Sequence, residues 1–153
     1  MRQLPVSVVV HMRARGRAGG VWTTLVIPDG DHVIVTNNGY SQPNLVVYDH
    51  TKQISRERVM LDSAWLGLAF HPDGKRLYSS GSAKNRVDEF SWDKAALKKT
   101  GELALPKPAN DSFVGGLAVS PDGKRLYAVH VLGEKLHAVD PNLYYLMGGD
   151  ETG

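Results

Sequence analysis

One pattern of apolar and polar positions recurs along the chain. A short apolar run leads into Pro-Asp-Gly, and a run with alternating character follows. Residues 67–78 read GLAFHPDGKRLY, residues 116–127 read GLAVSPDGKRLY, and a more divergent copy, LVIPDGDHVIV, occupies 25–35. Pro presets φ for a tight turn, Asp bonds to its own backbone, and Gly adopts a positive φ without steric cost. Each copy therefore predicts two strands joined by a hairpin turn.

A third predicted strand follows each hairpin and ends in aspartate. These strands span 45–49, 87–93 and 136–140, and their last residues lie 21, 21 and 19 positions after the Pro of the same unit. Fourth strands are predicted near 58–61 and 102–105. The three turns begin at 28, 72 and 121, so the unit repeats after 44 and then 49 residues. Four short antiparallel strands in a unit of this length are typical of a β-propeller blade.

The predicted fold is all-β: a partial β-propeller with about three four-stranded antiparallel blades. Helical-pair repeats are disfavoured because Pro-Asp-Gly interrupts every unit. The expected divisions are an N-terminal strand and Arg/Gly loop at 1–20, a first blade at 21–61, a second at 62–105, an incomplete third at 106–140, and a tail at 141–153. Residues 5–10 are interpreted as an outer strand of a preceding blade. Closed propellers have about four to eight blades. The chain is therefore expected to belong to a longer ring or to complete one with other copies.

The repeat GLAxxPDGKRLY, with Ile34-Val35-Thr36-Asn37 after the first turn, resembles the YVTN-type β-propeller repeat proteins. Some members of this family are lactonase-like, and in others the propeller precedes an alkaline-phosphatase-like phosphoesterase domain. The segments 35–41, 64–70 and 110–117 most resemble the propeller part of the two-domain group. The resemblance covers about residues 24–140. It implies a propeller fold and, by analogy with the two-domain relatives, an extracytoplasmic location.

Composition excludes some function classes without selecting one. Lys and Arg number 18 and Asp and Glu 16, so a net charge of +2 predicts no broad field for nucleic acid or membranes. The Arg and Gly residues of 11–20 form a single cluster without aromatics, and we interpret them as a solvated loop rather than an RNA-binding segment. Cysteine is absent, and no apolar run is long enough to predict a membrane span. The first ten residues lack the apolar core of a signal peptide, so the compartment is left unassigned.

Antiparallel strand order gathers candidate binding residues at one end of the blades. The loops between second and third strands share that end with the connectors between blades, and the Pro-Asp-Gly turns lie at the other. Loops on a rigid scaffold often bind ligands, amides hydrogen-bond polar groups, and aromatic rings stack on a ligand or partner. Alternatively, the amides are ordinary turn residues and the aromatic rings pack between blades. The candidates at this end are Asn37, Asn38, Trp65, Asn110, Phe113 and His130.

No recognisable catalytic motif occurs in the sequence. GxSxG, the P-loop and GxGxxG are all absent. None of the six histidines has metal-ligand spacing; His71 is interpreted as a surface residue beside a turn, and only His130 is a candidate. Adjacent Asp88 and Glu89 are expected on opposite faces of one strand, so they cannot form a carboxylate pair. We therefore expect no catalytic residue, metal or cofactor within this chain.

Two hypotheses from different classes remain open. The favoured one is a non-catalytic propeller module, part of a propeller-phosphoesterase protein, that binds or supports a partner. The alternative is a lactonase-like hydrolase acting on a sugar lactone, with His130 or Asn37 among its polar groups. The alternative requires an acid, a base and a cation together, whereas the candidate end offers amides, aromatic rings and one histidine. Exposed blade edges and apolar faces also predict self-association or a protein partner.

Overall fold

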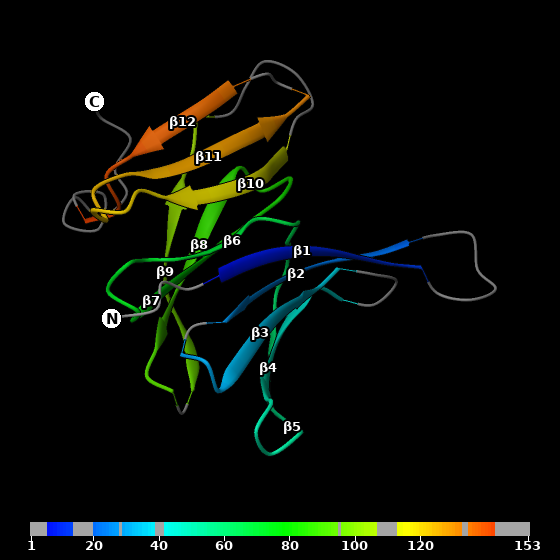
Figure 1. The fold of residues 1–153 in the computed structure, drawn as a ribbon. Coiled ribbons are helices and arrows are strands. Elements are labelled where there is room, and N and C mark those ends of the chain that lie inside the picture. The colour runs from blue at the N-terminus through cyan, green and yellow to red at the C-terminus, as the bar shows by residue number, and fades with distance from the viewer. Residues whose placement is uncertain are drawn as a thin grey trace.

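A computed structural model shows three antiparallel β-sheets that succeed one another around the molecule (Figure 1). It describes residues 6–13, 20–27, 29–38, 42–94, 96–106, 113–132 and 135–142, with backbone only for the first two ranges. Sheet 1 contains, in spatial order, β1 (Val6–Arg13), β2 (Gly20–Ile27), β3 (His32–Asn37), β4 (Asn44–Asp49) and β5 (Ile54–Met60). Sheet 2 contains β6 (Leu68–Phe70), β7 (Arg76–Ser80), β8 (Arg86–Trp92) and β9 (Leu97–Ala104). Sheet 3 contains β10 (Phe113–Val119), β11 (Leu126–Val131) and β12 (Lys135–Val139).

The prediction of an all-β partial propeller is confirmed. Every strand pairs with the strand that precedes or follows it in sequence, as in the up-and-down blades of a propeller. Neighbouring sheets approach each other through β2, β6 and β10, since β2 contacts β6 and β6 contacts β10. These three strands therefore lie toward the inner side of the arrangement, where a propeller has its central channel.

The position of β1 corrects one sequence-based interpretation. Residues 5–10 were expected to form an outer strand of a preceding blade, but β1 pairs with β2 from Val6 opposite Ile27 to Arg13 opposite Gly20. It is thus the first strand of sheet 1, which has five strands. An apolar strand near the start of the chain has the same pattern whichever neighbour it pairs with. For that reason the pattern predicted the strand and not its partner.

The hairpin turns have the predicted local chemistry. Gly30, Gly74 and Gly123 have φ values of 84°, 70° and 72°, in the left-handed region that glycine adopts most easily. In each turn the aspartate side chain accepts a hydrogen bond from the amide two residues later. These N–O distances are 3.0 Å for Asp29, 2.8 Å for Asp73 and 3.0 Å for Asp122. The turn geometry is therefore determined locally, within each copy of the repeat.

Two apolar clusters hold the sheets together. Between sheets 1 and 2, buried side chains of β3 and β4 pack on buried side chains of β6, β7 and β8; they include Ile34, Leu45, Phe70, Leu77, Phe90 and Trp92. Between sheets 2 and 3, the cluster includes Tyr78, Val87, Leu103, Val114, Leu126 and Ala128. Sheet 2 is consequently buried on both faces, and four consecutive residues of β7 and of β8 are buried.

His71 is a second correction. It was expected at the surface beside its turn, but it is buried, and its Nε2 lies 3.1 Å from the carbonyl oxygen of Gly123 in the turn of sheet 3. The turn of the next sheet covers the imidazole ring. A repeat in the sequence shows that the turns exist, but not that one turn lies against another.

Gly67 lies where sheets 2 and 3 approach each other closely. Its carbonyl oxygen accepts a hydrogen bond from the Ser80 amide, and its own amide donates to Ser80 Oγ. A Cβ atom at this position would lie 2.8 Å from the Gly115 carbonyl oxygen, 2.8 Å from Leu117 Cγ and 2.9 Å from Ser80 Cβ. Atoms therefore surround the site on several sides, and one of them belongs to the backbone of the neighbouring sheet.

Gly67→Ala is expected to reduce the free energy of unfolding by about 1–3 kcal/mol, the usual cost of overpacking a filled site. Gly116→Ala is the matched control, because the nearest atom to a Cβ there is Val129 Cβ at 3.9 Å. Urea unfolding of the two variants measures the difference. Equal stability of both variants would show that the sheets do not approach as closely at Gly67 as described.

Candidate functional site

The loop end of the sheets comprises the β3–β4, β7–β8 and β11–β12 loops and the β5–β6 and β9–β10 connectors. Backbone hydrogen bonds join these segments: the Leu61 amide donates to the Pro43 carbonyl at 2.8 Å, and the Leu105 amide donates to the Asn85 carbonyl at 2.8 Å. A third bond, from the Val114 amide to the Ser82 carbonyl at 3.0 Å, links sheet 3 to sheet 2. These bonds fix the described parts of the loop end within sheets 1 and 2 and between sheets 2 and 3.

Trp65 and Phe113 meet at the loop end. Trp65 lies in the connector before β6, and Phe113 is the first residue of β10. Their rings are arranged edge to face, with centroids 5.0 Å apart and planes at 67°. Both side chains are half-buried. The pair therefore stabilises the contact between the β5–β6 connector and the start of β10, and it also presents aromatic surface to solvent. Such pairs contribute about 0.5–1.5 kcal/mol beyond the area they bury.

Two of the asparagine candidates, Asn37 and Asn38, lie at the end of β3, far in the sequence from Trp65 and Phe113. Asn37 is the last residue of β3, where it opposes Asn44 of β4. Asn38 follows it, half-buried, and its Nδ2 is a buried atom that has no hydrogen-bond partner in the part of the chain that the structure describes. Such a donor costs free energy until it is bonded. Asn110 lies outside the described residues.

His130, the candidate histidine at the loop end, is buried. It shares the inward face of β11 with Leu126 and Ala128, and only 1% of its surface is exposed. Its Nδ1 lies 3.2 Å from Nε2 of His137 on the neighbouring strand, and the ring centroids are 4.8 Å apart. Sequence reasoning treated His130 as an isolated histidine because the spacing to its partner is not a metal-ligand spacing. This burial argues against direct contact with a ligand.

Burial lowers the pKa of His130 below its ordinary value of 6.5, and the nearby charges of His137 and Lys135 lower it further. A histidine that resists protonation in the folded state favours folding above the unfolded pKa. That contribution is lost as the pH falls from about 6.5 through the lower pKa of the folded state.

Acidification from pH 7.5 to pH 5 is therefore expected to lower the melting temperature of the wild-type chain more than that of His130→Leu. Leucine fills the buried site without a titrating group, and the half-buried His137 can then bond to water. Thermal unfolding at both pH values gives the comparison. The same loss in both proteins would mean that His130 does not couple folding to pH.

A group of charged residues lies next to the loop end, on sheet 2. Buried Asp88 accepts hydrogen bonds from Arg86 Nε at 2.8 Å and lies 3.0 Å from Lys99 Nζ. Arg86 also reaches Asp62 Oδ1 at 2.5 Å. Glu89 is turned the other way, and its Oε1 accepts a hydrogen bond from Thr100 Oγ1 at 2.7 Å. Asp88 and Glu89 thus bond to different partners, as expected for neighbouring residues on opposite faces of one strand.

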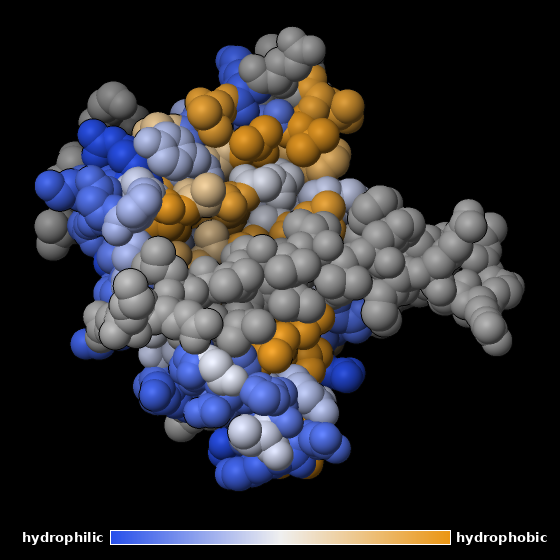
Figure 2. All heavy atoms as spheres, viewed as in Figure 1, coloured by the Kyte–Doolittle hydropathy of each residue, from blue (hydrophilic) through white to orange (hydrophobic). Residues whose placement is uncertain are grey.

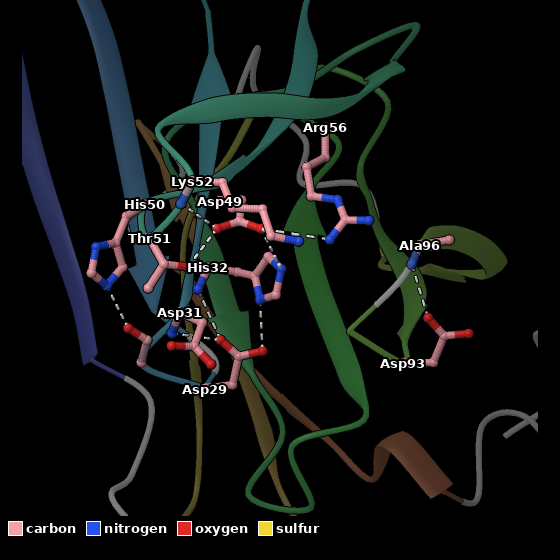
Figure 3. A network of polar contacts seen from close by, with 11 residues as sticks. Asp29, Asp31, His32, Asp49, His50, Thr51, Lys52, Arg56, Asp93 and Ala96 are labelled. Atoms are coloured by element: carbon pink, nitrogen blue, oxygen red, sulfur yellow. Dashed lines mark hydrogen bonds and ion pairs between the residues drawn. The ribbon is translucent and has the colours of Figure 1, made fainter.

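The turn end of sheet 1 carries a polar network that sequence reasoning missed (Figure 3). Buried His32 has its Nδ1 2.9 Å from Asp29 Oδ2, and its Nε2 4.0 Å from Asp49 Oδ2. Asp49 accepts hydrogen bonds from the Thr51 hydroxyl at 2.7 Å and the Lys52 amide at 3.0 Å, which lower the pKa of its carboxyl group below the ordinary value. The His32 ring also meets Trp92 of sheet 2 edge to face, with centroids 5.3 Å apart.

A comparison of the three copies of the sequence repeat gives a signal for this network. His32 occupies the fourth position after the turn proline, where the other copies have Arg76 and Arg125. Arg76 Nε donates to Asp73 Oδ2 at 2.9 Å, so a cationic or imidazole nitrogen bonds to the turn aspartate in both of the first two sheets. The same arrangement in successive sheets indicates that the network stabilises the turn rather than forming a reaction centre.

The described residue ranges contain no candidate metal cluster and no candidate membrane-spanning helix. No three or more His, Cys, Asp or Glu side chains in these ranges are grouped so that they could hold a metal ion. No helix in the same ranges is long and apolar enough to cross a membrane.

Comparison with known proteins supports the fold. No protein-family model and no curated protein matches the chain. Among solved structures, hydrazine synthase from Kuenenia stuttgartiensis matches with a TM-score of 0.64 and 16% identity over 88% of this chain and 55% of that one. A luciferin-regenerating enzyme matches with a TM-score of 0.53 and 19% identity over 89% of this chain and 43% of that one. Both are β-propeller-type folds, and the chain spans about half the length of either.

Proposed function

We propose that this chain is a non-catalytic β-propeller module that binds or supports a protein partner through its loop end. The observation that carries the proposal is the Trp65–Phe113 pair, which combines a fixed position with partly exposed aromatic surface. Aromatic side chains are enriched in protein interfaces because they provide contact area at low conformational cost. The resemblance of the repeats to YVTN-type proteins suggests the propeller of a propeller-phosphoesterase protein as the parent.

The three sheets correspond, in this proposal, to blades at 21–61, 62–105 and 106–140. Residues 1–20 add a strand to the first blade, and residues 141–153 form the tail. The connectors between these units present Trp65 and Phe113. Because each connector lies at the loop end, one partner could contact two blades at once.

The charged groups near the loop end support a binding role over a catalytic one. Arg86 contacts Asp62, Asp88 and Glu102, and Lys99 contacts Asp88 and Glu102. Acid–base catalysis requires a group within hydrogen-bond reach of the substrate and with a pKa suited to proton transfer. Here these cations and carboxylates bond to each other, and that arrangement fixes the loop positions.

Lactonase-like hydrolysis of a sugar lactone is the alternative. The observation that favours it is the buried Nδ2 of Asn38, a donor that lacks a partner among the described residues and that a polar ligand could satisfy. The neighbouring Asn37 would supply a second amide. His130, the other polar candidate, is buried on the face of sheet 3 that packs on sheet 2, and would act only if these two sheets moved apart.

Selection of peptides from a random phage-displayed library on the wild-type chain tests the binding proposal. Peptides enriched on the wild type are expected to lose at least tenfold in affinity for Trp65→Ser, because the aromatic surface is removed. Lys75→Ser, which changes an exposed residue at the turn end, is the control and should bind them as before. Enriched peptides that bind all three proteins equally would contradict a partner site at the loop end.

Hydrolysis of a panel of sugar lactones tests the alternative. The binding module is expected to produce no turnover above the buffer rate, with and without an added divalent cation. Turnover that is lost in Asn38→Ala, while thermal unfolding shows that this variant remains folded, would overturn the non-catalytic assignment and favour the lactonase-like function.

A further inference from the structure

The outer face of sheet 3 is apolar and exposed. Val129, Val131 and Leu136 are exposed by 43%, 36% and 63%, and Val129 and Leu136 are direct cross-strand partners. Figure 2 shows hydrophobic side chains gathered over β11 and β12 at the top of the view. We call this surface, made of Tyr127, Val129, Val131 and Leu136, the trailing face of sheet 3.

The internal repeat identifies what kind of surface covers such a face. Residues of sheet 3 correspond to residues of sheet 2 at an offset of 49, the distance between their turns at 72 and 121. Tyr127, Val129 and Leu136 thus correspond to Tyr78, Ser80 and Val87. In sheet 2 all three of these are 0% exposed. They are buried because sheet 3 lies against them, with Leu126 and Ala128 in the same apolar cluster as Tyr78 and Val87.

The chain carries a matching surface on sheet 1. Leu126 and Ala128, which cover sheet 2, correspond to Val33 and Val35 at an offset of 93, the distance between the turns at 28 and 121. Val33 and Val35 pair with Tyr48 and Val46 across β3 and β4. All four are half-buried, and they lie on the side of sheet 1 that faces away from sheet 2. We call this surface the leading face of sheet 1.

We propose that the trailing face of sheet 3 docks on the leading face of sheet 1 in a second copy of this chain, and that two copies close a six-sheet ring. The contact repeats the packing of sheet 3 on sheet 2 within one chain. It is head to tail, so it forms a ring when the rotation closes, and six sheets lie within the range of closed propellers.

This inference rests on the proposed propeller module and names its self-association partner. Analytical ultracentrifugation over a series of protein concentrations is expected to give the mass of two copies. Val129→Lys should reduce that mass to one copy, because a charge is then placed in the centre of the apolar contact. Ile54→Lys is the matched control, since Ile54 is similarly exposed but lies on β5, the outermost strand of sheet 1, and its mass should remain that of two copies.

Cross-linking tests which faces meet. The chain has no cysteine, so single cysteines can be introduced without background. Leu136→Cys and Val35→Cys, once mixed, are expected to cross-link through a short bismaleimide, and each variant alone should cross-link several-fold less. Equal cross-linking of Leu136→Cys with itself would indicate that two trailing faces meet, and would overturn the head-to-tail contact.

Two further results of the sedimentation experiment would overturn the proposal. A single-copy mass for the wild-type chain at all concentrations would overturn the proposal, and would assign the trailing face to a further blade of a longer chain. A ladder of larger masses would overturn closure at two copies. Trp65→Ser should still sediment as two copies. Loss of peptide binding by that variant therefore reports on the loop end alone, and the function and the ring can fail separately.

Discussion

A sheet that is apolar on both faces is stable only with a neighbour on each side. In β7, consecutive residues illustrate this constraint: Leu77 packs toward sheet 1, and Tyr78 packs toward sheet 3. Neither face of sheet 2 could be left in water without exposing buried rings and branched side chains. The remaining features of the structure serve this packing. Gly67 allows close approach, His71 joins two turns, and the ring of His32 fills the gap beside Trp92.

The fold could be predicted in unusual detail because its signals are local. Pro-Asp-Gly specifies a turn within three residues, and the runs on either side specify strands, so the all-β partial propeller followed from the repeat alone. What could not be predicted depends on neighbouring sheets. β1 has the same pattern whether it pairs forward or backward along the chain. His71 and His130 have ordinary surroundings in the sequence, yet both are buried by residues from another strand or sheet.

In the candidate site, too, local position could be predicted from the sequence and contacts with neighbouring strands and sheets could not. Strand order predicted that Trp65 and Phe113 share one end of the sheets. Their ring contact agrees with the interpretation that they pack between blades, and their partial exposure is what the binding proposal builds on. Strand order did not indicate that the His130 side chain points inward. A residue near the end of a strand is placed at one end of the sheet by strand order, but strand order does not determine which face of the sheet its side chain occupies. The sequence contained a signal for the network around His32, because the turn aspartate is repeated and His32 replaces the arginine of the other copies. It contained no signal for the burial of this network against sheet 2.

Every strand in the described sheets pairs with a neighbour in sequence. No hydrogen-bond ladder therefore crosses from one sheet to another, and the sheets are joined mainly by side-chain packing and a few bonds between turns, loops and connectors. The strand pairings within each sheet have short sequence separation, which favours fast formation of each sheet by itself. They also mean that a gene can gain or lose one unit of this length without breaking a strand pairing. The architecture thus tolerates duplication and deletion of a whole unit. Only the two sheet faces at the ends of the series are then left without a neighbouring sheet.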